Sequence, residues 1–280
     1  MKLVLPDRVL PLDEPVVMGV LNVTPDSFSD GGIHAGVEGA VAHGEKMVEE
    51  GAAIIDVGGE STRPGAAPVS ADEEIRRVVP VIERLAGRVR VPISVDTSKP
   101  AVMQAAIEAG AVLVNDVRAL KMPGALEAVA AGRAAVCLMH MQGEPRSMQE
   151  APRYDDVVAE VREFLRARTA ACERAGIPHE RICVDPGIGF GKTPAHNLAL
   201  LARLAELSGD GPPVLVGVSR KSLVGIITGR PPGERLAGSI AFAALAVANG
   251  AAIIRAHDVA ATVDAVRVAC ALRRATTGDA

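Results

Sequence analysis

Short apolar runs alternate with longer helix-like stretches along the whole chain. The runs are nearly continuous in Val, Ile, Leu and Ala, with no regular alternation of apolar and polar residues. This pattern is typical of strands that are covered on both faces, as in a parallel sheet. We therefore predict eight strands: Val16–Thr24, Ala53–Ser61, Ile93–Ser98, Val112–Val117, Ala135–Met141, Ile182–Gly187, Val214–Ser219 and Ala251–His257.

The stretches between these runs are rich in Ala, Glu and Arg, which favour helices. The clearest of them are Val37–Glu50, Ala71–Leu85, Ala101–Ala109, Asp155–Ala175 and Arg235–Asn249. Several helical stretches end in a glycine just before the next strand, and glycine commonly ends helices. The glycines predicted to end helices are Gly51, Gly110, Gly132, Gly176 and Gly250.

Eight strand–helix units follow one another without a linker-like segment, which predicts the α/β class and a (β/α)₈ TIM barrel. We expect a single domain over residues 1–280, with the barrel core at about 15–275. A doubly wound open sheet is the alternative. It is less favoured because the first strand lacks the G-x-G-x-x-G sequence that follows it in dinucleotide-binding folds.

The charge balance is close to neutral, with 30 basic and 34 acidic residues and no Lys/Arg run. We therefore expect no nucleic-acid partner, although a small anionic ligand fits. Cys137, Cys172, Cys183 and Cys270 are widely separated, which indicates buried reduced thiols. The apolar N-terminus breaks at Pro6-Asp7-Arg8, which argues against a signal peptide. These features together predict a cytoplasmic protein.

The stretch Leu236–Ile254 is uncharged and about long enough to cross a bilayer. Gly238 and Ser239 stand near its start, however, and Asn249-Gly250 interrupts it like the end of a helix. A buried helix followed by a buried strand fits this pattern better than a membrane span, so we expect no membrane partner.

Polar residues stand at the ends of nearly all the predicted strands, which is where barrel enzymes carry their chemistry. Helix capping is a sufficient explanation for Thr97, Asp116 and Asp258. It does not explain why polar side chains recur at similar places in four different units. Those four residues are Asn22, Asp96, Asn115 and Asp185.

The loops after the strands add oxygen donors, glycines, cations and scarce aromatic residues. The loop 22–32 offers several oxygen donors without Cys or clustered His, which suits Mg²⁺. The loop 58–65 combines glycines, hydroxyls and Arg63, which suits an anion. Phe28 and Phe190 stand in loops of a chain with four Phe, one Tyr and no Trp, so we expect them to cover a flat ligand. The pattern predicts a ligand with a heterocycle and a phosphate.

Several motifs that span almost the whole chain in order resemble those of the dihydropteroate synthase family. They are MGVLNVTPDSFSDGG, IIDVGGESTRPGA, ISVDTSKP, VNDV, LMHMQGEPRSMQ, DPGIGFGK, GVSRKS and RAHDV. One departure is Arg118-Ala119-Leu120, where many members carry Ser-Gly, so the rim of that loop is expected to differ.

The resemblance implies three groups of binding residues and one metal ligand. The pterin contacts would be Asp96, Asn115, Asp185, Lys221, Arg255 and Met139. The pyrophosphate contacts would be Thr62, Arg63, Arg255 and His257, with Asn22 as the Mg²⁺ ligand. The p-aminobenzoate contacts would be Phe28, Ser61, Pro64, Phe190 and Ser222.

The family resemblance also implies a transferase. It would condense (7,8-dihydropterin-6-yl)methyl diphosphate with p-aminobenzoate, give 7,8-dihydropteroate and pyrophosphate by an SN1-like displacement, and serve folate biosynthesis. Asp30, Lys221 and Arg63 would be catalytic, sulfonamides would inhibit, and the protein would be a homodimer. Lys192 is expected to lie at the surface and to matter less than Lys221. The alternatives are a pterin-binding methyltransferase domain and a non-catalytic pterin-binding paralogue.

Overall fold

The computed structural model describes residues 1–23, 32–61, 68–143, 148–209 and 211–277. In these ranges eight parallel strands form one sheet in the order β8-β7-β6-β5-β4-β3-β10-β9, so each strand lies beside its neighbour in the chain. A parallel bridge between Val184 and Val214 joins the two ends of this order. The sheet therefore closes into the predicted barrel.

All eight predicted strands are present, each within a residue or two of its expected start. They are β3 (Val16–Asn22), β4 (Ile54–Gly58), β5 (Ile93–Asp96), β6 (Leu113–Asp116), β7 (Ala135–Met139), β8 (Ile182–Asp185), β9 (Leu215–Gly217) and β10 (Ile253–Ala256). Their side chains are almost all buried, because the barrel interior covers one face and the helices cover the other. The reading of continuous apolar runs as doubly covered strands is confirmed.

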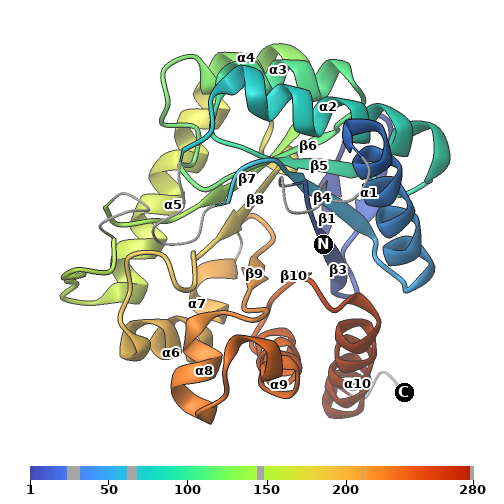
Figure 1. The fold of residues 1–280 in the computed structure, drawn as a ribbon. Helices are drawn as coiled ribbons and strands as arrows, with labels where there is room; N and C mark the ends of the chain where they lie inside the picture. Colours follow the sequence, from blue (N-terminus) through green and yellow to red (C-terminus); the bar gives the residue numbers. More distant parts are fainter. Residues whose placement is uncertain (24–31, 62–67, 144–147, 210, 278–280) are drawn as a thin grey trace.

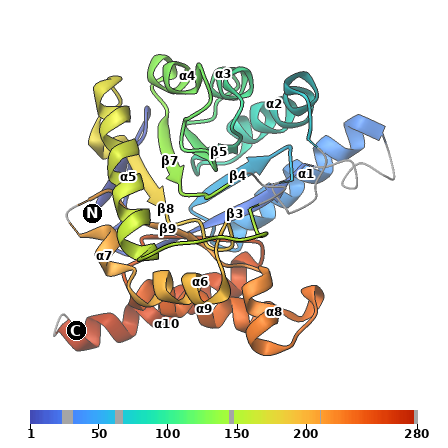
Figure 2. The ribbon, with the colours of Figure 1, turned by 90° about the vertical axis from the view of Figure 1, so that its left-hand side faces the viewer.

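Helices surround the strands on all sides (Figure 1). They are α1 (Gly32–Glu49), α2 (Ala71–Arg88), α3 (Pro100–Glu108), α4 (Ala125–Gly132), α5 (Val157–Arg174), α6 (Pro194–Ala202), α7 (Ala205–Ser208), α8 (Ser222–Thr228), α9 (Leu236–Ala248) and α10 (Val259–Thr277). In both views α2, α3 and α4 lie on one side of the barrel and α8, α9 and α10 on the opposite side (Figure 2).

A hairpin at the N-terminus was not predicted. The strands β1 (Lys2–Val4) and β2 (Val9–Pro11) pair antiparallel to each other. Leu3, Leu5 and Leu12 are buried in one cluster with Met18 and Ile54 from the barrel strands. The break at Pro6-Asp7-Arg8 is thus the turn of a hairpin that covers the barrel interior.

Four of the five predicted C-terminal glycines have a positive φ, namely Gly51, Gly110, Gly176 and Gly250. Gly132 is the last residue of α4, as predicted, but the left-handed conformation that follows the helix is taken by Arg133, with φ 58°. Gly132 has a packing role, since a Cβ at that position would lie 2.8 Å from Ile107 Cδ1 on α3.

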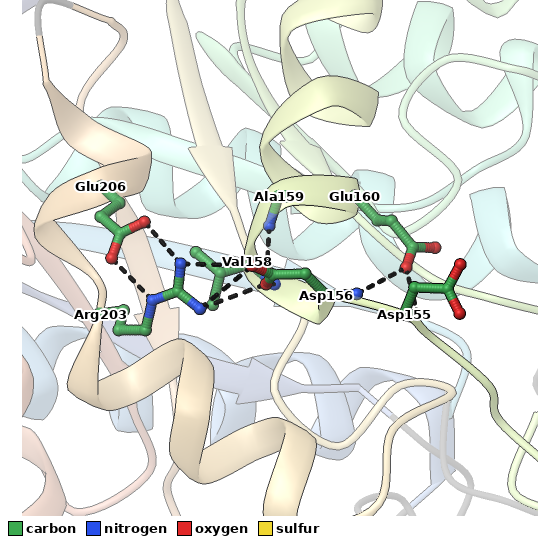
Figure 3. A network of polar contacts seen from close by, with 7 residues as sticks. All are labelled: Asp155, Asp156, Val158, Ala159, Glu160, Arg203 and Glu206. Atoms are coloured by element: carbon green, nitrogen blue, oxygen red, sulfur yellow. Dashed lines mark hydrogen bonds and ion pairs between the residues drawn. The ribbon is translucent and has the colours of Figure 1, made fainter.

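Ion pairs connect the ends of α5, α6 and α7. Asp156 caps α5 by accepting hydrogen bonds from the amides of Val158 (2.9 Å) and Ala159 (3.2 Å). Arg203, just after α6, reaches the same carboxylate at 3.2 Å and Glu206 at 2.7 Å (Figure 3). This network joins the start of α5 to the α6–α7 segment on the outside of the barrel.

The stretch Leu236–Ile254 folds as α9 followed by β10, as predicted. Among the described residues, no helix has both the length and the apolar character that a membrane span requires.

Candidate active site

The strand ends that carry the predicted site residues are in register across the sheet. Asn22 on β3 lies beside Gly58 on β4, and Gly58 lies beside Asp96 on β5. Asp96 in turn lies beside Asn115 on β6. Because parallel neighbouring strands end at one edge of the barrel, three predicted site residues share one level of its mouth.

Arg255 on β10 reaches across the barrel mouth to two carboxylates. Its Nε donates to Asp56 Oδ2 at 2.6 Å, and its Nη2 donates to Asp96 Oδ2 at 2.7 Å. Asn115 Nδ2 also donates to Asp56 Oδ2, at 2.9 Å. The guanidinium thereby joins residues from four strands into one polar cluster.

Asp56 was given no role by the sequence analysis. Its side chain is fully buried (0% exposed) and fixes both Arg255 and Asn115. The signal was present in the sequence, since a lone carboxylate inside the apolar run IIDVG needs a partner.

Burial raises the pKa of Asp96 to about 7; the neighbouring carboxylate of Asp56 adds to the rise, and Arg255 opposes it. Burial also raises the pKa of Asp185, against the opposing charge of Lys221. Asp185 Oδ1 accepts a hydrogen bond from the Gly187 amide at 2.7 Å. Such raised pKa values in a barrel mouth are typical of functional carboxylates.

We expect replacement of Asp96 by Asn to change the pH dependence of stability. The folded protein holds a proton on Asp96 up to about pH 7, whereas the unfolded chain loses it near 3.8. Asp96 therefore lowers the free energy of unfolding progressively as pH rises between these values.

Thermal unfolding of wild type and Asp96→Asn at pH 5 and pH 8 measures this effect. The variant should gain in melting temperature relative to wild type as pH rises. A constant difference at both pH values would contradict the raised pKa.

Phe190, in the loop after β8, and Lys221, in the loop after β9, lie in contact with each other. Lys221 Nζ donates to the Ile188 carbonyl at 2.5 Å and lies 4.7 Å from the centre of the Phe190 ring. Burial lowers the pKa of Lys221 to about 8, against the attraction of Asp185. Met139 lies beside Asp185 on the neighbouring strand.

The ends of β9 and β10 are joined through His257. Its amide donates to Ser219 Oγ at 3.2 Å, and its Nδ1 lies 3.1 Å from the same oxygen. Ser222 starts α8 and is exposed. Asn22 and Ser61 are also exposed, each close to the end of its strand.

Five of the predicted site residues lie outside the described residues. They are Phe28, Asp30, Thr62, Arg63 and Pro64. Among the residues that the structure describes, no group of three or more His, Cys, Asp or Glu side chains could hold a metal ion.

The loop after β6 has the departure expected at Arg118-Ala119-Leu120. Ala119 and Leu120 both have positive φ (52° and 54°), which is uncommon for residues other than glycine. Asp116 accepts hydrogen bonds from the amides of Arg118 and Leu120, and Arg168 donates to both Ala119 and Leu120 carbonyls. Asp116 therefore stabilises this turn and does not cap the next helix, α4, whose N-cap residue is Gly124.

A pocket opens beside this loop, over the end of β7. It is lined by Val117, Arg118, Lys121, Met122, Met139, Met141, Gly143 and Phe164. Met139 belongs both to this lining and to the expected pterin contacts, and Arg118 and Lys121 give this pocket two cationic side chains.

The expectation that Lys192 lies at the surface is wrong. Its side chain is 2% exposed, and its ammonium is held by neutral acceptors of the loops after β7 and β8. The Gly-rich sequence around Lys192 indicated a loop, but a short loop that packs against its neighbour can bury a lysine.

These features define a barrel enzyme whose polar site lies at the carboxyl ends of its strands. A family model described as pterin binding enzyme matches residues 18–257. The dihydropteroate synthase of Escherichia coli (strain K12) is 56% identical over 268 residues, which cover 96% of this chain and 95% of that protein.

Two solved structures are similar over nearly their whole length. The Yersinia pestis dihydropteroate synthase with a sulfonamide drug complex has a TM-score of 0.92 and 52% identity, covering 98% of this chain and 99% of that chain. The Xanthomonas albilineans dihydropteroate synthase with 4-aminobenzoic acid has a TM-score of 0.91 and 56% identity, covering 97% and 98%. The chain therefore belongs to the dihydropteroate synthase family of pterin-binding enzymes.

Proposed function

We infer that this chain is a transferase that joins (7,8-dihydropterin-6-yl)methyl diphosphate to p-aminobenzoate and releases pyrophosphate. The observation that carries this inference is the cluster of Arg255, Asp56, Asp96 and Asn115 in the barrel mouth. Full-length similarity to enzymes of that reaction supports it. The pathway served is folate biosynthesis.

The pterin site is built from buried carboxylates and an amide. A pterin ring carries amino and ring N–H donors, and Asp96, Asn115 and Asp185 offer acceptors for them in a largely dry mouth. Met139 and Lys221 bound the same space, and Arg255 lies across its other side. Binding the ring would offset the cost of burying the Asp185 charge.

The leaving pyrophosphate needs positive charge where its own charge develops. Arg255 lies near the carboxyl end of β10 and His257 directly follows that strand, and Thr62 and Arg63 of the loop after β4 would add to them. Asp30 would stabilise positive charge at the pterin methylene as the bond to oxygen lengthens in a dissociative displacement.

Asn22 would hold Mg²⁺. Its side chain carries an amide oxygen at the carboxyl end of β3, and such a hard oxygen is the kind of donor that the ion prefers. This oxygen fits the ion, which when bound would neutralise charge on the pyrophosphate oxygens.

The p-aminobenzoate site would lie beside the pterin site, next to Phe190. The ring of Phe190 is fixed against Lys221, and Ser222 follows directly at the start of α8. Phe28, Ser61 and Pro64 would complete the site. The aniline nitrogen then attacks the methylene and needs little activation by a base.

Product formation tests the function. Purified protein with the pterin diphosphate, p-aminobenzoate and Mg²⁺ should give 7,8-dihydropteroate, identified by mass. A sulfonamide should inhibit competitively with p-aminobenzoate, because it mimics that substrate. Inhibition that p-aminobenzoate does not relieve would place the drug elsewhere.

We also propose that two copies of the chain form a homodimer through α9 and α10. Leu245 on α9 and Val268 and Leu272 on α10 are 58%, 69% and 65% exposed, although large apolar side chains favour burial.

The four cysteines are free and buried, which suits the reducing cytoplasm.

Replacing Leu272 by Glu should shift the protein from dimer to monomer in sedimentation experiments, because it puts a charge into the apolar interface. Ile226 on α8 is 62% exposed, so Ile226→Glu is the matched control and should stay dimeric. A wild-type monomer at micromolar concentration would refute the homodimer.

A further inference from the structure

Lys192 is a buried lysine that the proposed chemistry does not use. Its Nζ lies 2.9 Å from His140 Nδ1, 3.2 Å from the His140 carbonyl, 3.0 Å from the Gly187 carbonyl and 2.9 Å from the Phe190 carbonyl. No ion pair joins it to a carboxylate within the part of the chain that the structure describes. Burial lowers the pKa of Lys192 to about 7, with Asp185 opposing the fall. Burying this group therefore costs free energy, which calls for a local reason.

His140 is an acceptor in this arrangement. Burial and the nearby Lys192 charge lower the pKa of His140 to about 3, so its ring is neutral at neutral pH. A neutral ring whose Nδ1 accepts from an ammonium carries its proton on Nε2. The ring is further fixed edge-on to Phe164, with centroids 4.9 Å apart.

The reason for the buried lysine lies in the turn 187–191. Gly187, Gly189 and Gly191 all have positive φ, so the turn is tight. A Cβ at Gly187 would lie 1.9 Å from the His140 carbonyl oxygen, and one at Gly191 would lie 2.2 Å from that of Gln142. The turn thus lies directly against the segment after β7. The buried carbonyls of Gly187 and Phe190 need hydrogen-bond donors, and the Lys192 ammonium supplies them.

The same turn carries Phe190 of the proposed p-aminobenzoate site and contacts Lys221. The Ile188 carbonyl accepts from Lys221, and the Phe190 ring lies under the Lys221 ammonium. A change in the turn would therefore move both groups together.

We propose that Lys192, with His140, is a positioning residue for the second substrate: it fixes the turn 187–191, and with it Phe190 and Lys221, against the end of β7. This proposal rests on the proposed function, since it needs p-aminobenzoate to bind beside Phe190.

The single tyrosine of the chain reports on this turn. Tyr154 donates its hydroxyl to the Gly191 carbonyl at 2.8 Å, and the chain has no Trp. Tyrosine emission and its quenching by acrylamide therefore measure the order of the turn in the free enzyme, without any catalysis.

The test compares Lys192→Met with wild type. Met fills about the same volume without charge or donors, so the melting temperature should hold or rise, because a buried charge is removed. The KM for p-aminobenzoate should rise at least tenfold, kcat should change less, and acrylamide should quench Tyr154 more strongly. Lys192→Gln keeps two donors and should restore part of both effects.

Leu85→Ala is the matched control for lost stability. Leu85 lies on α2, is fully buried against α1 and does not touch the turn. It should lower the melting temperature and leave KM and quenching unchanged. A KM and quenching within twofold of wild type in Lys192→Met would overturn the proposal. Wild type without product formation would instead refute the proposed function, while the quenching comparison would still test the turn.

Discussion

Replacing Asp185 by Asn is expected to weaken pterin binding at least 100-fold and to leave the melting temperature unchanged or higher. Asp185 is 5% exposed, and burial raises its pKa, so its charge costs stability in the free enzyme. The pterin donors that offset this cost make charge-assisted hydrogen bonds, and losing them costs about 3 kcal/mol, or about 100-fold in affinity. Calorimetric titration with a pterin and a thermal melt measure the two effects.

Asp116→Asn is the control for this prediction. Asp116 is also a fully buried carboxylate at a strand end, but its oxygens accept from Ser98 and from the amides of Arg118 and Leu120. Its replacement should lower the melting temperature and spare pterin affinity. If Asp185→Asn binds pterin as wild type does, Asp185 is not a pterin ligand.

Replacing Lys221 by Ala is expected to lower kcat/KM about 1000-fold, mainly through kcat. Lys221 is held by the Ile188 carbonyl and the Phe190 ring, between the two proposed substrate sites. A loss of about 4 kcal/mol is the usual size for removing a preorganised cation from a dry site. In wild type, kcat/KM should fall as pH rises through about 8, since that is where the pKa of Lys221 lies.

Arg220→Ala is the matched control for Lys221→Ala. Arg220 is the neighbouring cation, but it is half exposed and paired with Asp258 at 2.5 Å. It should change kcat/KM less than threefold. Steady-state kinetics also separates Lys221 from Lys192, because the Lys192 variant should act on the KM for p-aminobenzoate. Equal losses of kcat in both would remove that distinction.

The barrel was predictable because its signals are local and repeated. Runs such as Ala135–Met139 are apolar throughout, and glycines such as Gly51 and Gly110 mark helix ends. Gly132 ends α4 as predicted, but the room that it makes for Ile107 depends on the neighbouring helix α3 and could not be predicted from a local pattern. The N-terminal hairpin was missed because each of its strands has only three residues.

The site was predictable one strand at a time, but its contacts were not. Strand-end position identified Asp96 and Asn115, and the family resemblance identified Arg255. The ion pairs of Arg255, however, span 199 and 159 residues to Asp56 and Asp96. Such contacts depend on barrel closure and register, which no local pattern encodes. Lys192 was misjudged for a related reason, since its burial depends on the neighbouring β7 loop.

The two alternatives differ from the synthase in what they need from these residues. A methyltransferase domain would use the pterin contacts without the loop Ser61-Thr62-Arg63-Pro64-Gly65, which is present in the sequence. A non-catalytic paralogue would need neither Asn22 nor Arg63, and both are present. Nearly full-length identity of 56% to a dihydropteroate synthase disfavours both.

Pyrophosphate release from the pterin diphosphate, measured with and without p-aminobenzoate, tests the central claim most directly. The account predicts fast release with p-aminobenzoate, slow release without it, and matching amounts of pyrophosphate and 7,8-dihydropteroate. Release at the same rate with and without p-aminobenzoate, or none in either case, would contradict it.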